Sequence, residues 1–366
     1  RHVMPVGLLS HCAFATNCTQ LLQQLVSIGI VILGVYQIKE GNLTMGGMIA
    51  CVILGGRGMA PLGQVASLFT RLQQSRTALQ GLNQIMELPT ERSEGRQRVQ
   101  LEEFKPDIEL KDVQLTYPNQ PAPALAGLNL EIKAGERVAL LGRVGSGKST
   151  LLKLLAGLYE PEQGVVNLSG VELRQFDPSD LRQRVGYVSQ QVTLFYGSVL
   201  DNLRLGALWV SDDEVLSAVK AAGVDRFTEG HPDGVQRSVG ERGELLSGGQ
   251  RQAVALARSL VTSPSLLLFD EPTSSMDMNS EGEFVSALTQ YLDEHSGTTL
   301  LLSTHKPAVL KLVDRIIVLQ DGKVAADGPR DQVMGKLSQS AKSPAAAATK
   351  KKAPAKKKSP KTNPDK

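Results

Sequence analysis

The chain has 366 residues, 41% of them hydrophobic and 21% charged, which is enough for more than one structural unit. Its net charge of +3 is unevenly divided: residues 338–366 hold nine lysines and one aspartate, so they carry +8 and leave 3 − 8 = −5 for the rest. A mildly acidic body argues against a nucleic-acid-binding fold, and we expect no specific nucleic-acid partner. Cys12, Cys18 and Cys51 give neither a disulfide framework nor paired metal-ligand spacing.

The N-terminal part of the chain is strongly apolar. No Asp, Glu, Lys or Arg occurs between residues 3 and 38. A membrane-spanning helix needs about 20 apolar residues. Residues 21–38 come close to that length, and after a short polar break a second weakly polar run covers residues 43–62. We therefore expect a transmembrane hairpin. The alternative is a pair of buried helices in a soluble protein, which two adjacent glutamines and the many glycines favour.

The character of the chain changes after residue 62. Apolar residues recur at helical spacing up to Met86, which predicts an amphipathic helix running on from the membrane into the cytoplasm. Residues 87–106 are polar and interrupted by Pro89 and Gly95, as is typical of a linker. Alternating apolar and polar residues from Ile108 onward predict the start of a β-containing domain.

Residues 142–149 read Gly-Arg-Val-Gly-Ser-Gly-Lys-Ser and fit the phosphate-binding P-loop pattern. They lie between a predicted buried strand and a predicted helix, the context in which this pattern is specific. The glycines let backbone N–H groups close around a β-phosphate at the positive end of the helix. Lys148 should reach the β- and γ-phosphates, and the Ser149 hydroxyl should ligate Mg²⁺. The nucleotide-binding residues expected here are Gly142, Gly145, Ser146, Gly147, Lys148, Ser149 and Thr150.

Two acidic residues, Asp270 and Glu271, follow a second apolar run that predicts a buried strand over residues 265–269. We expect Asp270 to hold Mg²⁺ through water and Glu271 to act as the general base that polarises the attacking water. The alternative is a strand that simply ends in a charged pair. A third predicted strand, residues 299–304, leads to His305.

Residues 246–250 read Leu-Ser-Gly-Gly-Gln ahead of a strong helix-forming segment. Ser247, Gly248, Gly249 and Gln250 therefore present N–H groups and a helix dipole to an anion. Leu-Ser-Gly-Gly-Gln resembles the signature motif of the ATP-binding-cassette (ABC) ATPases. The P-loop before it and the Asp-Glu pair after it strengthen this resemblance. In that family the signature caps the γ-phosphate held by the other cassette, so the resemblance implies a homodimer with ATP between its cassettes.

The resemblance implies further roles. His305 matches the switch histidine, which contacts the γ-phosphate and orients the water. Gln190 resembles the glutamine that touches Mg²⁺ and communicates with the membrane part. Tyr117 resembles the aromatic residue that stacks on adenine, although a core tyrosine is the alternative. Asp277 ends Ser-Ser-Met-Asp, where the family usually has Ser-Ala-Leu-Asp in the loop between cassettes.

Other segments resemble exporters in particular. Residues 239–243 are similar to the segment that exporters use to contact intracellular helices. Residues 56–62, 227–234 and 326–330 resemble the type I secretion ATPases of Gram-negative bacteria, especially the subgroup that exports large adhesins. That likeness implies a multi-pass inner-membrane protein with a cytoplasmic cassette and an unfolded protein substrate carrying a C-terminal signal. It also implies a periplasmic adaptor and an outer-membrane channel as partners.

The expected fold class is α/β: a P-loop ABC cassette with a helical subdomain, preceded by a partial α-helical transmembrane region. The expected domains are residues 1–86 (partial transmembrane), 87–106 (linker), 107–337 (nucleotide-binding) and 338–366 (disordered Lys/Ala/Pro-rich tail). Only two spanning helices fit before the cassette, so we expect a C-terminal fragment. ATP and Mg²⁺ are the expected cofactors. The alternatives are an exporter of lipid or drug-like molecules and a non-transport ABC ATPase or DNA-associated binding module. For the tail, binding to anionic lipid or nucleic acid is the alternative to a solvated segment.

Overall fold

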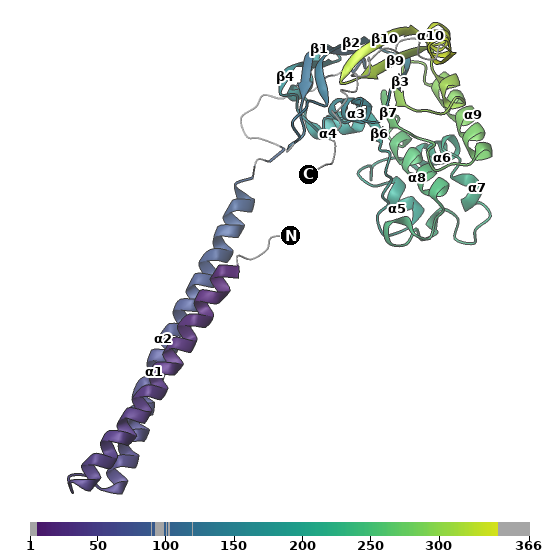
Figure 1. Cartoon of the computed structure of the whole chain (residues 1–366). Helices are drawn as coiled ribbons and strands as arrows, with labels where there is room; N and C mark the ends of the chain where they lie inside the picture. Colours follow the sequence, from purple (N-terminus) through teal and green to yellow (C-terminus); the bar gives the residue numbers. More distant parts are fainter. Residues whose placement is uncertain are drawn as a thin grey trace, which may run out of the picture. The chain divides into compact units, whose positions relative to one another are not determined.

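The computed structural model divides the chain into two compact units, Arg1–Glu91 and Arg92–Lys366. The first unit is helical, and the second combines strands with helices (Figure 1). The residues that the structure describes are 6–88, 90–91, 99, 101, 103–118 and 120–342.

The first unit is a hairpin of two long helices, α1 (Val6–Lys39) and α2 (Met45–Met86) (Figure 1). The Thr44 side chain caps the start of α2 by accepting a hydrogen bond of 3.2 Å from the N–H of Gly47. The second helix continues through Pro61 as one element. The second expected span and the amphipathic helix after it are therefore a single helix.

Two glycines lie at close contacts between the helices. A Cβ atom on Gly34 of α1 would lie 2.7 Å from Cγ of Met48, and one on Gly55 of α2 would lie 2.7 Å from Cδ1 of Ile30. A Cβ atom at either position would require the Met48 or Ile30 side chain to shift, so these glycines allow the close contacts between the helices. Small residues are used in this way where helices pack in membranes.

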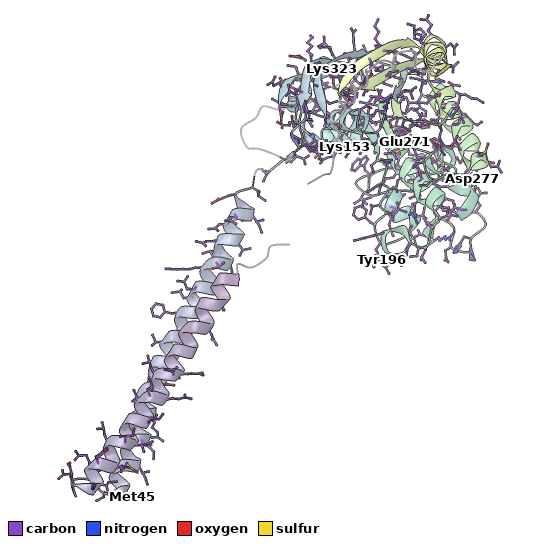
Figure 2. The ribbon with its side chains drawn as sticks, in the orientation of Figure 1. Met45, Lys153, Tyr196, Glu271, Asp277 and Lys323 are labelled. Atoms are coloured by element: carbon purple, nitrogen blue, oxygen red, sulfur yellow. The ribbon has the colours of Figure 1, made fainter. Side chains whose placement is uncertain are left out.

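Apolar side chains point outward along both helices, with Met45 at the turn end (Figure 2). Within the described residues, Gln20–Lys39 is the helix that is long and apolar enough to cross a membrane, and 6% of it is buried. In α2 the apolar stretch Met45–Gly58 is shorter than a span requires. The structure has the expected pair of helices joined by a turn, whereas the second expected span over residues 43–62 is not apolar over a sufficient length. Its glycines and Arg57 lower its hydropathy.

The second unit contains two sheets. The strands of the antiparallel sheet follow the order β2-β1-β4-β5 and are β1 (Ile108–Leu115), β2 (Leu125–Ile132), β4 (Gln163–Leu168) and β5 (Val171–Glu172). The larger sheet follows the order β10-β9-β3-β8-β7-β6. It comprises β3 (Arg137–Leu141), β6 (Val185–Val188), β7 (Leu266–Asp270), β8 (Thr299–Ser303), β9 (Arg315–Gln320) and β10 (Lys323–Pro329).

The strands of the larger sheet run parallel except for β10, which pairs antiparallel with β9. Parallel strands end at the same edge of a sheet, so the segments that follow β3, β7 and β8 come together there. Ligands of open α/β sheets bind at this edge. The expected strands at residues 265–269 and 299–304 are thus present with boundaries shifted by one residue.

Helices cover the larger sheet and fill the rest of the unit (Figure 1). They are α3 (Lys148–Leu155), α4 (Pro178–Arg184), α5 (Val199–Leu203), α6 (Asp212–Ala221), α7 (Asp225–Thr228), α8 (Gly248–Leu260), α9 (Met278–Glu294) and α10 (Arg330–Lys342), with short 3₁₀ turns η1 (Leu173–Gln175), η2 (Gly234–Gln236), η3 (Glu241–Gly243) and η4 (Val309–Leu312).

The larger sheet is buried on both faces, which explains its nearly continuous apolar strands. In β7, Leu266 and Leu268 enter the core shared with α3 and the antiparallel sheet. Leu267 and Phe269 enter the opposite core, which contains side chains of α5, α6 and α8. The side chains of one strand thus alternate between an α/β half and a helical half. The expected α/β fold with a helical subdomain is confirmed.

The linker expected at residues 87–106 is shorter in the structure. The N–H of Val99 donates to the carbonyl of Gln175 at 3.0 Å, and the Phe104 ring packs edge-on against Phe176 at 6.1 Å between ring centres. Apolar side chains within the polar segment attach its second half to the cassette. At the other end, residues 338–342 belong to α10 instead of starting the expected tail. Residues 343–366 lie outside the described residues.

Candidate functional site

The turn from β3 to α3 adopts a conformation that only glycines can take. Gly142 and Gly147 have φ angles of +150° and +102°. A Cβ atom on Gly142 would lie 2.3 Å from the carbonyl oxygen of Leu319, and one on Gly147 would lie 2.6 Å from that of Ala124. Both the dihedral angle and the neighbouring backbone exclude side chains at these positions. The loop therefore curls tightly around the N-terminus of α3.

Lys148, the first residue of α3, folds back over this loop. Its Nζ donates hydrogen bonds to the carbonyls of Gly142 at 2.8 Å and Arg143 at 3.0 Å. Burial lowers the pKa of Lys148, while the nearby carboxylates of Glu271 and Asp270 act in the opposite direction. The loop carbonyls and the two carboxylates keep the buried ammonium in place at the edge of the sheet.

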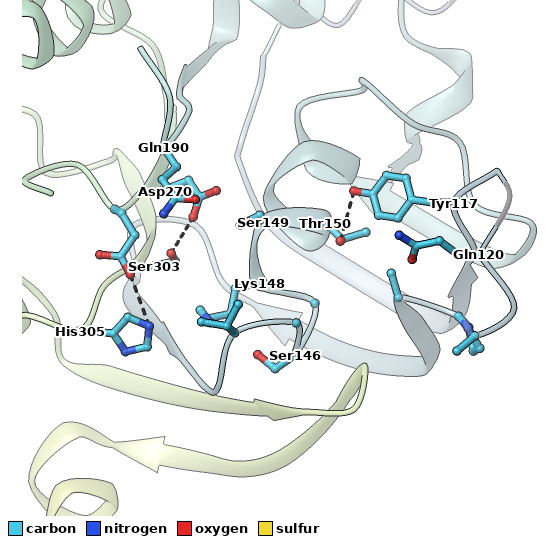
Figure 3. A pocket seen from close by; sticks show the side chains of 17 residues that line it. Tyr117, Gln120, Ser146, Lys148, Ser149, Thr150, Gln190, Asp270, Ser303 and His305 are labelled. Atoms are coloured by element: carbon cyan, nitrogen blue, oxygen red, sulfur yellow. Dashed lines mark hydrogen bonds and ion pairs between the residues drawn. The ribbon is translucent and has the colours of Figure 1, made fainter.

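Tyr117 lies on the antiparallel-sheet side of a cavity that the P-loop and Lys148 also line. Its hydroxyl donates to Oγ1 of Thr150 at 3.2 Å, and its ring meets Tyr159 edge-on at 5.2 Å (Figure 3). It also packs against buried side chains beneath α3. The ring is partly packed and partly open to the cavity, a position compatible with both of its expected roles.

Asp270 ends β7 and is almost fully buried, with 3% of its surface exposed. Oδ1 accepts a hydrogen bond of 2.7 Å from the hydroxyl of Ser303, which ends the neighbouring strand β8 (Figure 3). A buried carboxylate requires such partners. The bond between adjacent strand ends fixes the direction in which Asp270 points.

Glu271 has a left-handed backbone, with φ at +52°. Its N–H donates to the carbonyl of Ser303 at 3.0 Å, and its carbonyl accepts from Nε2 of Gln252 at 2.9 Å. Unusual backbone angles of non-glycine residues gather at functional sites, where surrounding contacts maintain them. Here two backbone hydrogen bonds hold the conformation that turns the carboxylate toward the cavity.

The carboxylate of Glu271 faces His305. Oε1 lies 3.5 Å from Nε2 of the histidine (Figure 3). Burial raises the pKa of Glu271 above its ordinary value, and Asp270 adds to this effect. His305 and Lys148 act in the opposite direction. A raised pKa makes Glu271 a stronger proton acceptor than a solvated carboxylate when it is ionised.

These groups line one cavity of about 460 Å³ (Figure 3). Its walls hold most of the residues that the sequence predicted, namely Tyr117, Gly145, Ser146, Gly147, Lys148, Ser149, Thr150, Gln190, Asp270, Glu271 and His305. Gly142 lines a neighbouring cavity of about 660 Å³.

The oxygen atoms available in this cavity suit a small, hard cation. Ser149, Gln190 and Asp270 contribute a hydroxyl, an amide and a carboxylate to its walls, the ligand types that Mg²⁺ prefers. Among the described residues no cluster of three His, Cys, Asp or Glu side chains could hold a metal alone. A cation at these oxygens would need further ligands from a nucleotide, so the donor set fits Mg²⁺ bound together with phosphate.

The signature residues lie elsewhere, at the N-terminus of α8. Ser247 caps this helix: its hydroxyl accepts from the N–H of Gln250 at 3.2 Å, and Oε1 of Gln250 accepts from the N–H of Ser247 at 3.0 Å. This reciprocal pair is a capping box. The N–H groups of Gly248 and Gly249 belong to the first turn, where a helix provides no acceptors of its own.

Asp277 lies beside the signature. It shares a cavity of about 480 Å³ with Ser247, Gly248, Gly249 and Gln250. Its carboxylate caps α9 by accepting from the N–H groups of Asn279 and Ser280, each at 2.9 Å. The signature cavity and the P-loop cavity have no lining residue in common. Within one chain, the expected anion-binding residues are therefore divided between two places.

Sequence reasoning missed three residues that organise the site: Ser303, Gln252 and Lys306. Ser303 had a usable signal, because it lies near the end of the strand predicted over residues 299–304, and in the structure it pairs with Asp270. Gln252 occupies a position in α8 that is 1% exposed. A glutamine there indicates a buried hydrogen-bonding role. Lys306 gave no signal, since its partners are distant in sequence.

Comparisons with known proteins agree with this geometry. Residues 125–274 match the family described as ABC transporter. Leukotoxin translocation ATP-binding proteins LktB of Mannheimia glucosida and Mannheimia haemolytica are each 36% identical over 315 residues, which is 86% of this chain and 44% of the relative. The chain thus spans somewhat less than half the length of these curated relatives.

A solved structure supports the same assignment over a longer stretch. The structure of a bacterial Atm1-family ABC exporter with ATP bound has a TM-score of 0.71 at 27% identity, covering 90% of this chain and 58% of that one. The two chains therefore share a fold over most of this chain. The chain therefore carries an ATP-binding cassette of the ABC transporter family.

Proposed function

We propose that this chain is the ATP-hydrolysing part of a membrane ABC exporter. The observation that carries the proposal is the convergence of Lys148, Asp270, Glu271 and His305 on the P-loop cavity. A cationic loop, a buried carboxylate and a general base beside a histidine are the parts that phosphoryl transfer to water requires.

The proposed reaction uses Glu271 as the base. The oxygen of a water molecule bonds to the γ-phosphorus while one of its protons passes to the Glu271 carboxylate. The bond from the γ-phosphorus to the β–γ bridging oxygen breaks, which leaves ADP and phosphate. His305, 3.5 Å from Glu271, orients the water. Lys148 neutralises charge on the β- and γ-phosphates.

Mg²⁺ bound with ATP would be held by Ser149, Gln190 and Asp270, and it would add positive charge beside the phosphate oxygens. The chain prepares this site through the hydrogen bond between Ser303 and Asp270. Tyr117 is proposed to stack on adenine, since it is partly open to the same cavity. Gly142, Gly145, Ser146, Gly147 and Thr150 would surround the phosphates.

We also propose that two copies act together. The signature residues and Asp277 line a cavity without the P-loop, so within one chain they have no nucleotide of their own. In a homodimer, the first-turn N–H groups at Gly248 and Gly249 would face the γ-phosphate bound by the partner cassette. ATP would join the cassettes, and hydrolysis would release them.

The proposed cargo is a protein, exported by type I secretion from the inner membrane of a Gram-negative bacterium. The support is the likeness to proteins named for leukotoxin translocation and the apolar hairpin. A periplasmic adaptor and an outer-membrane channel would complete the pathway. The adhesin-type subgroup is proposed from residues 56–62, 227–234 and 326–330 alone.

To test the proposal, the full chain is expressed in a Gram-negative host. Its distribution between membrane and soluble fractions and its ATP turnover are then measured. We expect it in alkali-washed membranes, with Mg²⁺-dependent turnover that Lys148→Ala abolishes. C-terminal segments of large secreted proteins should stimulate turnover more than lipids or drug-like molecules do. A soluble chain that turns over ATP would favour a non-transport ATPase, and a chain without turnover would contradict the proposal.

A further inference from the structure

The segment that follows Glu271 is held from two sides. We call residues 271–277 the connecting loop, because it runs from the P-loop cavity to the signature cavity. From the signature helix α8, Gln252 donates to the carbonyl of Glu271 and accepts from the N–H of Ser275, both at 2.9 Å. Gln252 is 1% exposed, so these bonds are shielded from water.

Lys306 holds the connecting loop from the other side. Its Nζ donates to the carbonyl of Thr273 at 2.6 Å and pairs with Oε2 of Glu281 in α9 at 2.5 Å. The same Nζ also donates a longer hydrogen bond of 3.4 Å to the carbonyl of Met276. An ammonium group has three N–H donors, and here each has an acceptor.

The pair formed by Lys306 and Glu281 differs from an ordinary surface ion pair. The side chain of Glu281 is 11% exposed and that of Lys306 is 31% exposed. Surface pairs contribute little, whereas removing one partner of a buried pair leaves an uncompensated charge. The position of Lys306 is further fixed by its N–H, which donates to Oγ1 of the buried Thr304 at 3.1 Å.

Lys306 directly follows His305, whose contact with Glu271 is long for a hydrogen bond at 3.5 Å. Small shifts of the backbone at residue 306 would therefore make or break this contact. The connecting loop provides the source of such shifts. Asp277 at its end lines the signature cavity, and the carbonyl of Asp277 accepts from the N–H of Glu281, the partner of Lys306.

We propose that Lys306 is a positioning residue that couples the signature face to the contact between His305 and Glu271. A group that docks beside Asp277 shifts the connecting loop and the first turn of α9. Lys306 transmits that shift through Thr273 and Glu281 to His305. The inference rests on the proposed ATP hydrolysis and adds to it the route by which docking at one cavity sets the geometry of the other.

The test compares variants of the full chain in detergent, by measuring kcat and KM for MgATP. Lys306→Met keeps the length of the side chain but removes its charge and donors, and should lower kcat at least tenfold with KM within about twofold. Lys306→Arg keeps charge and donors and should retain at least a third of kcat. Lys111→Met removes an exposed lysine paired with Glu109 at 2.6 Å and should change neither constant.

Two further arms separate positioning from general stability. Glu281→Gln is a smaller change in case Lys306→Met does not fold, and it should also lower kcat at unchanged KM. In a His305→Ala background, with phosphate release followed over hours, Lys306→Met should lower kcat no more than twofold, because the residue through which it acts is gone.

The outcomes distinguish this inference from the proposed function. Wild-type turnover with unchanged kcat in Lys306→Met and Glu281→Gln would overturn the role of Lys306 and leave the ATPase proposal intact. Equal losses in kcat with and without His305 would also overturn it. No turnover in the wild-type chain would instead contradict the proposed function itself.

Discussion

Replacing Glu271 by Gln removes the proposed proton acceptor while keeping the size of the side chain. The backbone contacts of this residue go to the carbonyl of Ser303 and the amide of Gln252, so they do not depend on the carboxylate. The left-handed backbone at φ +52° is therefore preserved. We expect the variant to fold normally and to lose hydrolysis.

The expected loss of turnover follows from the proposed role of Glu271 as general base. A positioned general base contributes about 10²–10⁴-fold to a rate, and each factor of ten is about 1.4 kcal/mol of activation free energy. Glu271→Gln should therefore lower kcat by about 10²–10⁴, or roughly 3–5 kcal/mol. ATP affinity should stay the same or rise slightly, because one of two carboxylates in the cavity becomes neutral while Lys148 remains.

Stability provides an independent check of the same residue. Burial raises the pKa of Glu271, so the folded state binds this proton more tightly than the unfolded state does. The ionised carboxylate then lowers stability at neutral pH, and the effect vanishes below the unfolded pKa. Without nucleotide, Glu271→Gln should melt at a higher temperature than wild type at pH 7.5, and the difference should shrink as the pH falls toward about 4.5.

The measurements are steady-state phosphate release, equilibrium binding of labelled ATP and thermal unfolding at several pH values. Glu294→Gln, at an exposed carboxylate far along α9 from the cavity, is the matched control. Turnover within a few-fold of wild type would refute the role of Glu271 as base. A melting temperature lower than wild type at every pH would refute the electrostatic reasoning.

Three other perturbations have expected outcomes. Lys148→Ala should weaken ATP binding about tenfold or more in an equilibrium binding assay, since a charge-assisted contact to phosphate is lost; unchanged affinity would rule out that contact. Ser247→Arg should leave ATP binding nearly intact but prevent ATP-driven dimerisation in gel filtration, because a bulky cation occupies the signature cavity; a dimer formed with ATP would disprove the second-copy argument. Deleting residues 343–366 should leave ATP turnover in detergent unchanged, since every residue of the P-loop cavity lies upstream, and should weaken binding to anionic liposomes in a salt-sensitive way; a large loss of turnover would make the tail part of the catalytic machinery.

The sequence predicted those parts of the fold and of the site that depend on interactions between residues close together in the chain. The P-loop depends on glycines that must adopt positive φ angles, so its sequence specifies its shape. The strand before Asp270 is buried on both faces, and its continuous apolar run shows this directly. The expected roles of the two motifs, phosphate binding for the P-loop and Mg²⁺ binding and base catalysis for the Asp-Glu pair, also assigned them to one site.

Features that depend on distant partners were not predictable. The attachment of Val99 and Phe104 depends on residues around Phe176, which are far along the chain. The contacts of Lys306 join the segment after β8 to α9, and no spacing rule connects them. The left-handed backbone of Glu271 was equally hidden, because no glycine marks it.

The capping box at the start of α8 has a consequence for how tightly two cassettes could be joined. The hydroxyl of Ser247 already accepts from the N–H of Gln250, so at this donor a phosphate oxygen would only replace one acceptor by another, and the N–H groups of Gly248 and Gly249 are the donors left for it. Such an exchange has a small net free energy even though each bond is strong by itself. The capping box thus limits how many first-turn donors strengthen the contact, which suits a contact that must form and break once in every turnover.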